Sequence, residues 1–305
     1  MGLLLPVALG IAAYIVSRFY PALDALFLAL IFGIFFGGVV GKGNVEKIAE
    51  KSLSITLPVG IVLYGANVKF PNFYEISLPI LILTFISALF MGLSVFVIAK
   101  RLGVGGKLPV LLACGTAICG ASAIAIVSSI LKPSKEEFST AVIVITIVGL
   151  TGAAVYPALH GFLTKDDFAT VCGATLHQTG LVKIASKDFG SDVLQKALTV
   201  KSIRIALIAV VALLVSLIYA EHRFYVPGYI VGFLIMSFMS STYLGGWSDW
   251  IEPVSTIAFS TTLASIGLCV SRQDIQRARL SPLVASYIGW FFTSATIIAI
   301  LRWLI

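Results

Sequence analysis

The chain has 305 residues, of which 59% are hydrophobic and 11% are charged, whereas a soluble domain carries about 25% charged residues. So few charges cannot cover a water-exposed surface, which excludes an ordinary soluble protein and leaves no room for a separate soluble domain. The formal net charge is +7, but the basic residues lie singly in short loops rather than in one patch, so no nucleic-acid partner is expected.

Eleven apolar segments follow one another along the chain, and a membrane span needs about 20 mostly apolar residues. The segments are 3–18, 23–41, 53–69, 78–99, 108–131, 139–163, 168–185, 201–220, 227–243, 254–271 and 282–304. They predict an all-α, multi-pass membrane protein with 10–11 transmembrane helices, in which residues 1–305 form a single domain in contact with the lipid bilayer. No Lys or Arg precedes the first segment, so a retained span is expected rather than a cleaved signal peptide.

The loops favour one orientation in the cell inner (plasma) membrane. If all eleven segments cross, the loops on the N-terminal side are richer in Lys and Arg than the opposite loops, which predicts a cytoplasmic N-terminus. A basic cluster from Lys183 to Arg204 departs from this pattern. A functional demand on the cluster would account for the exception.

Two distant stretches share the same features. Leu53–Phe70 and Thr256–Gln273 are both apolar, with a Gly near the end and then a basic residue, and a Pro opens the segment that follows each. An odd number of spans separates them, so the copies would have opposite orientations. Such inverted repeats are typical of secondary transporters, although any two apolar helices look somewhat alike.

The centre of segment 108–131 predicts an interrupted helix. Its small residues are Gly115, Thr116, Cys119, Gly120, Ala121 and Ser122. Gly costs about 1 kcal/mol relative to Ala in a helix interior, and a helix that restarts at Ala121 would expose N–H groups that bind anions. The alternative interpretation is close helix packing through small residues.

Segment 168–185 is the second interrupted candidate. Its polar centre consists of His177, Gln178, Thr179 and Gly180. A lone His in an apolar run is more often a packed residue than a ligand, but the neighbouring Gln, Thr and Gly expose more backbone than packing needs. The pattern predicts either a broken span or a re-entrant loop, with a second helix beginning at Thr179–Leu181.

Lys201 and Arg204 open segment 201–220 and are three residues apart, so they share one helix face. One interpretation places them in the headgroups, where long cationic side chains snorkel. The other packs them against the two interruptions, facing two helix N-termini, where a bound oxyanion would relieve the repulsion. No Asp or Glu lies centrally in any segment, which favours an anion over a cation; no metal and no cofactor is expected.

The order of these motifs resembles a known family. Ser52–Leu163 looks like one repeat of the superfamily of bile acid–sodium symporters and sodium–proton antiporters. More specifically, ICGASAIAIVSSI, LHQTGLVKIAS and VKSIRIAL together resemble the sulfate exporter family of the YeiH type. The resemblance covers nearly the whole chain.

The resemblance implies a transporter with inverted repeats and two crossed broken helices. Core helices would occupy about 78–220 and 282–305, and panel-like helices about 1–70 and 227–271. The implied substrate is sulfate or a related sulfur oxyanion. One departure stands out: only one segment separates the two interrupted ones, which makes them parallel by simple counting, whereas the superfamily crosses them antiparallel.

The leading hypothesis is a secondary active transporter of a small anion that works by alternating access and is not an enzyme. No G-x-x-x-x-G-K-[ST] phosphate-binding motif occurs, so a gradient would supply the energy. Proton or sodium coupling and a homodimer are left open. The alternatives are a sodium-coupled organic anion symporter, a passive channel, and a membrane-embedded hydrolase with Ser122 as nucleophile and His177 as base.

Overall fold

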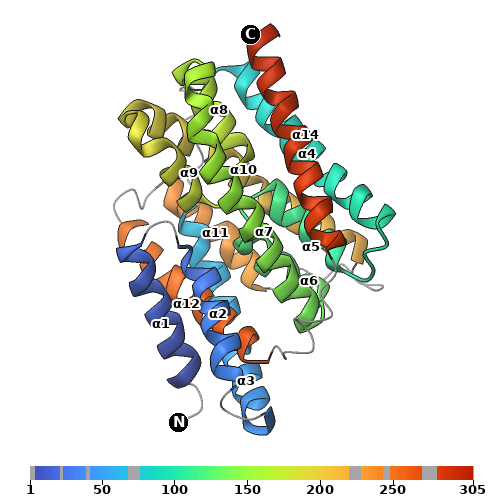
Figure 1. Ribbon diagram of the computed structural model, residues 1–305. Coiled ribbons are helices and arrows are strands. Elements are labelled where there is room, and N and C mark those ends of the chain that lie inside the picture. The colour runs from blue at the N-terminus through green and yellow to red at the C-terminus, as the bar shows by residue number, and fades with distance from the viewer. Residues whose placement is uncertain are drawn as a thin grey trace. The chain divides into compact units, whose positions relative to one another are not determined.

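The computed structural model describes residues 4–20, 23–38, 42–67, 76–219, 228–242, 248–269 and 280–304, and the regular elements within these ranges are all helices. Nine of the predicted segments each coincide with one main helix, and two coincide with a pair of shorter helices. The predicted all-α class is confirmed (Figure 1).

The helices of the predicted segments have the following bounds. They are α1 (Leu4–Phe19), α2 (Ala25–Gly37), α3 (Lys42–Tyr64), α4 (Leu78–Arg101), α5 (Leu108–Ala117), α6 (Ala121–Leu131), α7 (Lys135–Val155), α8 (Lys165–Thr175), α9 (Thr179–Ser186), α10 (Ser191–Tyr219), α11 (Gly228–Thr242), α12 (Ser248–Cys269) and α14 (Ser281–Leu304). Short 3-10 turns extend three of them: η1 (Gly65–Asn67), η3 (Tyr156–Phe162) and η4 (Lys187–Phe189).

Five helices of the described chain are long and apolar enough to cross a membrane: α4, α7 with its η3 extension, α10, α12 and α14. The apolar helices α1, α2, α5, α6 and α11 are shorter, as is the apolar part of α3. A membrane protein is therefore supported by helix length and composition.

The chain divides into two compact units. The first consists of Met1–Lys69, Ala125–Thr140 and Ala209–Arg279, and the second of Phe70–Ile124, Ala141–Ile208 and Leu280–Ile305. The predicted identity of these ranges as panel and core helices stays a prediction.

In the first unit, α3 and α12 pack against each other with opposite directions. Ser265 donates to Ser52 at 2.8 Å, and the hydroxyls of Thr56 and Thr262 lie 2.8 Å apart. The residue numbers rise along α3 while those of their partners fall along α12, so the two helices are antiparallel. An inverted pair of helices requires this packing. Gly33 brings α2 so close to α12 that a methyl group there would overlap the carbonyl oxygen of Ala264.

Both predicted interruptions are present. Helix α5 ends at Ala117 and α6 begins at Ala121, while α8 ends at Thr175 and α9 begins at Thr179. In the first turn Gly120 has a φ of +71°, a left-handed conformation that glycine adopts at little cost.

The α8–α9 pair folds back on itself. The rings of Phe168, at the start of α8, and Phe189, after α9, have centroids 4.9 Å apart, and His160 contacts both. A continuous helix would separate residues 168 and 189 by about 30 Å, at 1.5 Å per residue. The segment is thus a hairpin that returns to its starting side, which resolves the choice that the sequence left open in favour of the re-entrant loop.

The α5–α6 pair also folds back. A methyl group at Gly115 would lie 2.8 Å from Cδ1 of Ile124, although a continuous helix would separate these residues by about 13 Å along its axis. The predicted broken span is corrected here: the turn at 118–120 reverses the chain instead of continuing it.

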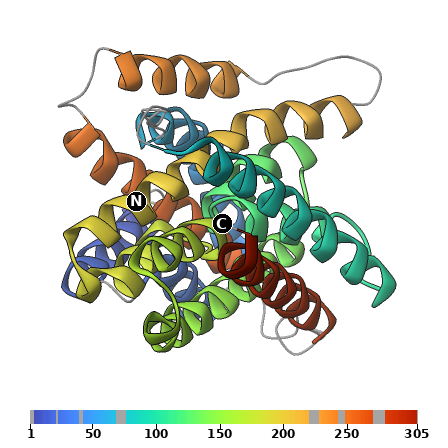
Figure 2. The ribbon, with the colours of Figure 1, turned by 90° about the horizontal axis from the view of Figure 1, so that it is seen from above.

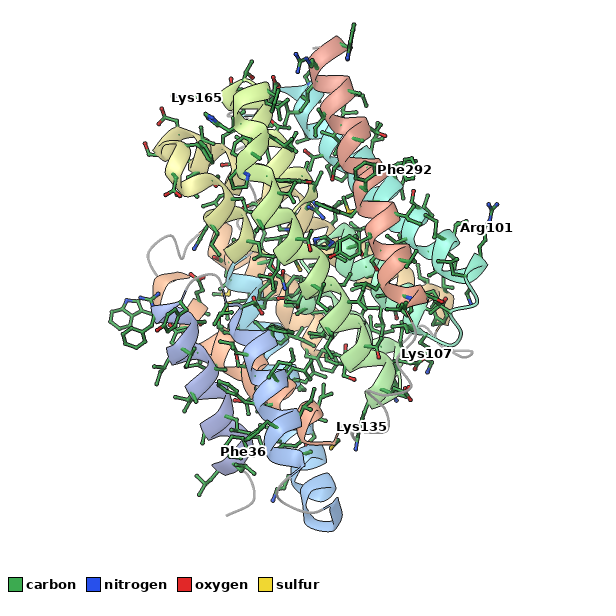
Figure 3. All side chains as sticks on the ribbon, viewed as in Figure 1. Phe36, Arg101, Lys107, Lys135, Lys165 and Phe292 are labelled. Carbon is green, nitrogen blue, oxygen red and sulfur yellow. The ribbon has the colours of Figure 1, made fainter. Side chains whose placement is uncertain are left out.

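The two hairpins enter from opposite sides and meet half-way. Lys107, just before α5, and Lys165, the first residue of α8, lie at opposite ends of the second unit (Figure 3). The α8–α9 tip reaches Gly149, near the middle of the Lys135–Phe162 span, where a methyl group would lie 2.9 Å from Oε1 of Gln178. The α5–α6 tip reaches the same level, because Gly115 also packs beside Ile145.

Helix α14 runs along the second unit beside α4 and α8 (Figure 2). Near its end, Arg302 donates to the carbonyl of Phe162 at 3.1 Å, and Ser294 shares the hydroxyl of Tyr156 with Thr175 of α8. A single long helix therefore connects the two ends from which the hairpins enter.

The hairpins are copies of one pattern. The same number of residues separates Cys114 from Cys172, Gly115 from Gly173 and Ala121 from Thr179. Each hairpin is followed by a long helix, α7 or α10. With one candidate span in each copy, α7 or α10, successive copies would have opposite orientations in a membrane, which would remove the parallel-versus-antiparallel conflict of the sequence.

This topology predicts which loops share a membrane face. With hairpins at both interruptions, Gly105→Cys and Glu136→Cys should react with an impermeant thiol reagent from one face of oriented vesicles. Gly161→Cys and Asp188→Cys should react from the other face. All four positions are exposed. Labelling of positions 105 and 136 from opposite faces would mean that α5 and α6 form a broken span.

Candidate functional site

Helix α10 carries two buried cations to the point where the hairpin tips meet. Lys201 and Arg204 are both fully buried. Nζ of Lys201 donates to the carbonyl oxygens of Ile118 at 2.7 Å, Leu176 at 2.7 Å and His177 at 2.5 Å. An ammonium has three N–H groups, so all of its donors are used.

Arg204 binds both hairpins in the same way. On the α5 side, Nε donates to the carbonyl of Ala117 at 2.9 Å and Nη2 to that of Thr116 at 2.8 Å. On the α8 side, Nη1 donates to the carbonyls of Leu176 at 2.9 Å and Gly173 at 3.3 Å. One guanidinium therefore joins the two tips.

This geometry corrects the predicted orientation of the basic pair. Lys201 and Arg204 face the C-terminal ends of α5 and α8, not the N-terminal ends of α6 and α9. Helix C-termini carry about half a negative charge and unpaired carbonyls, so buried cations are attracted there and repelled from N-termini. The membership of Lys201 and Arg204 in an anion site stays a prediction, while the three N–H donors of Lys201 bind backbone carbonyl oxygens.

The other ends of the interruptions present N–H groups. The first intrahelical bonds of α6 and α9 run from the amides of Ile124 and Val182, so the amides of residues 121–123 and 179–181 precede them. These are the N–H positions expected from the sequence. In the first turn Ala121 and Ser122 are buried, whereas in the second Thr179 is half-buried and Gly180 is exposed.

His177 and Gln178 place polar atoms in the same region without satisfying them. His177 is fully buried, and neither of its ring nitrogens has a hydrogen-bond partner. Nε2 of Gln178 donates to Thr146 at 3.3 Å, but its buried Oε1 is unpartnered. Buried polar groups are nearly always hydrogen-bonded, so these atoms are the candidate contacts for a ligand or a water molecule.

Gly120 and Gly149 hold the Gln178 side chain between the α5–α6 tip and α7. A methyl group at Gly120 would lie 2.9 Å from Cγ of Gln178, and one at Gly149 would lie 2.9 Å from its Oε1. Cys119 is buried in the turn beside Gly120. The structure thus gathers the predicted residues of both interruptions and of α10 in one place.

Sequence reasoning missed Thr146 and Gly149, which line the site from α7. The repeat supplies a signal that could have found Thr146, because this residue occupies the position in α7 that Arg204 occupies in α10. Gly149 has no counterpart glycine in α10.

Two other kinds of site find no support in the described chain. No group of three or more His, Cys, Asp or Glu side chains able to hold a metal ion occurs among the described residues. The ring nitrogens of His177 make no hydrogen bond to Ser122, and the membrane-embedded hydrolase stays an untested alternative.

Known relatives cover almost the whole chain. A UPF0324 membrane protein of Archaeoglobus fulgidus is 47% identical over 98% of this chain and 92% of its own length. Another, of Clostridium perfringens, is 30% identical over 90% of this chain and 87% of its own. No solved structure matches the chain. Residues 1–286 match the family described as conserved hypothetical protein 698, and the chain belongs to this family of membrane proteins.

Proposed function

We propose that the protein is a secondary active transporter of a small anion, with sulfate or a related sulfur oxyanion as the substrate class. The observation that carries the proposal is the meeting of two opposed hairpins at buried, unsatisfied polar groups. Their tips place two helix N-termini beside His177 and Gln178. Irregular backbone at membrane depth is characteristic of transporter substrate sites.

The charge balance of the site favours an anion. Lys201 and Arg204 bring two positive charges, and the C-termini of α5 and α8 offset them by about half a charge each. The carboxylates described in the second unit all lie at the base of the α8–α9 hairpin, away from its tip. They are Asp166, Asp167, Asp188 and Asp192. A net positive potential therefore remains at the tips, next to the free amides.

Alternating access follows from the repeat architecture in this proposal. Opposed hairpins that belong to inverted copies offer two equivalent routes, one from each face. The resemblance to the YeiH-type family and its superfamily supports the substrate class, although the hairpins differ from the crossed broken helices of that fold. We place the protein in the cell inner membrane with a cytoplasmic N-terminus. With both hairpins re-entrant, Lys132 and Lys135 join the N-terminal side and Lys165 leaves it, so that side remains the richer in Lys and Arg.

A thermal-shift screen of the purified protein tests the proposal. Sulfate, sulfite, thiosulfate, phosphate and small carboxylates would be compared with chloride, each with and without sodium. At least one sulfur oxyanion is expected to raise the melting temperature in a saturable manner. A sodium-dependent response to carboxylates alone would favour the organic anion symporter, and no response to any oxyanion would reject the proposal.

Two matched histidine variants sharpen this screen. His177→Gln, in the site, should abolish most of the oxyanion response. His160→Gln, at the base of the α8–α9 hairpin, should retain it. Saturable counterflow of labelled sulfate in liposomes would then distinguish a carrier from a passive channel, because a channel gives no counterflow.

A further inference from the structure

We propose that the exposed face of α9 lines the aqueous access path to the site and that Lys183 attracts the anion into it. This inference rests on the proposed function and adds a positioning residue outside the predicted site. The path would open at the end of the second unit where the α8–α9 hairpin begins, at Lys165.

The two hairpin tips differ in exposure. In the α5–α6 hairpin, Ala121 is 2% exposed and Ser122 is 9% exposed. Their counterparts in the repeat are Thr179, which is half-buried, and Gly180, which is exposed and would have open space around an added methyl group. The N-terminus of α9 therefore borders free space, while that of α6 does not.

The chemistry of the exposed α9 face indicates water rather than lipid. Gly180 and Lys183 are three residues apart and share this face, and both are exposed. Helix α4 shows what an exposed apolar face looks like in the same unit: Ile82, Phe85, Ile86, Leu89, Phe90 and Leu93 are all exposed. The α9 face carries no fully exposed apolar residue; its apolar member, Ile184, is half-buried.

Lys183 is the cation best placed to act on an incoming anion. It lies about one helical turn from the α9 N-terminus and forms no ion pair within the described part of the chain. Lys196 is nearby in the hairpin base, but it is paired with Asp166 at 2.8 Å. A positive charge this close to the α9 N-terminus raises the anion concentration there, against the repulsion of Asp167, Asp188 and Asp192 at the same hairpin end, and salt screens both effects.

Cysteine accessibility tests the path without assuming any substrate. Gly180→Cys should react with a water-soluble thiosulfonate reagent well above the background of the unsubstituted protein. Ala121→Cys, its repeat counterpart, should react at least tenfold more slowly. A Gly180→Cys that reacts only with a lipid-soluble maleimide would show a lipid-facing surface and overturn the inference.

Sulfate titration tests the role of Lys183. At low ionic strength, Lys183→Gln should raise the dissociation constant for sulfate several-fold and Lys183→Glu about tenfold or more, and both effects should shrink in added chloride. The melting temperature of the sulfate-free protein should stay unchanged. Lys196→Gln is the control and should leave the dissociation constant within twofold.

The outcomes separate the two proposals. If the wild-type protein responds to sulfate and Lys183→Gln binds it equally well, this inference fails while the proposed function stands. If the wild-type protein responds to no oxyanion, the proposed function fails and the role of Lys183 fails with it, whereas the cysteine result still decides whether the path is aqueous.

Discussion

Arg204→Met is expected to destabilise the protein by about 3 kcal/mol or more, because each buried carbonyl left without a donor costs about 1–3 kcal/mol. The change leaves the carbonyls of Thr116, Ala117 and Gly173 without this donor and Leu176 with only Lys201. Unfolding of the detergent-solubilised protein by heat or by sodium dodecyl sulfate would measure the loss.

Arg204→Lys should recover only part of this stability, because a single ammonium cannot reach carbonyls on both hairpins with the geometry of a guanidinium. Lys196→Met is the control, since its ion pair with Asp166 is partly exposed and such pairs contribute about 0–1 kcal/mol. A stability of Arg204→Met equal to that of Lys196→Met would contradict the joining role of the guanidinium.

Gly173→Ala is expected to be the most disruptive small substitution in the α8–α9 hairpin. An added methyl group would overlap the carbonyl oxygen of Ala197 and lie 2.7 Å from Cβ of Val200. Backbone cannot move aside as a side chain can, so α8 must shift away from α10. The shift would stretch the hydrogen bonds of Lys201 and Arg204, and both stability and sulfate binding should fall together.

Gly180→Ala is the matched control in the same hairpin. Nothing lies within 4 Å of its added methyl group, and Ala is favoured over Gly in a helix by about 1 kcal/mol. Melting temperatures of the two variants would be compared in one detergent. If Gly173→Ala melts as high as Gly180→Ala, the α8–α10 contact is looser than the structure shows.

Much of the architecture can be predicted from the sequence, because long apolar runs predict membrane helices. The interruptions near Gly120 and Gln178 could be predicted too, since Gly, Ser and Thr at the centre of such a run weaken a helix. So could the shared face of Lys201 and Arg204. Each of these features depends on residues close together in the chain.

The direction of the chain after each interruption could not be predicted. A three-residue turn allows a helix either to continue or to reverse, and only contacts between distant residues, such as Phe168 with Phe189, decide between them. The same limit applies to the basic pair. A helix face can be read from spacing, but whether it meets the C-terminal or the N-terminal ends of α5 and α8 depends on the reversal.

The joining of both hairpins by one helix has an electrical consequence. Arg204 is charged, and the three carbonyl oxygens around Lys201 stabilise the ammonium form of its side chain. Moving one charge across a whole membrane changes the energy by about 2.3 kcal/mol per 100 mV. Any step that carries α10 and the tips along the membrane normal therefore feels the membrane potential when the site is empty. In the proposed transporter, a bound dianion would cancel the two charges, so voltage would act on the return of the empty carrier and not on the loaded one.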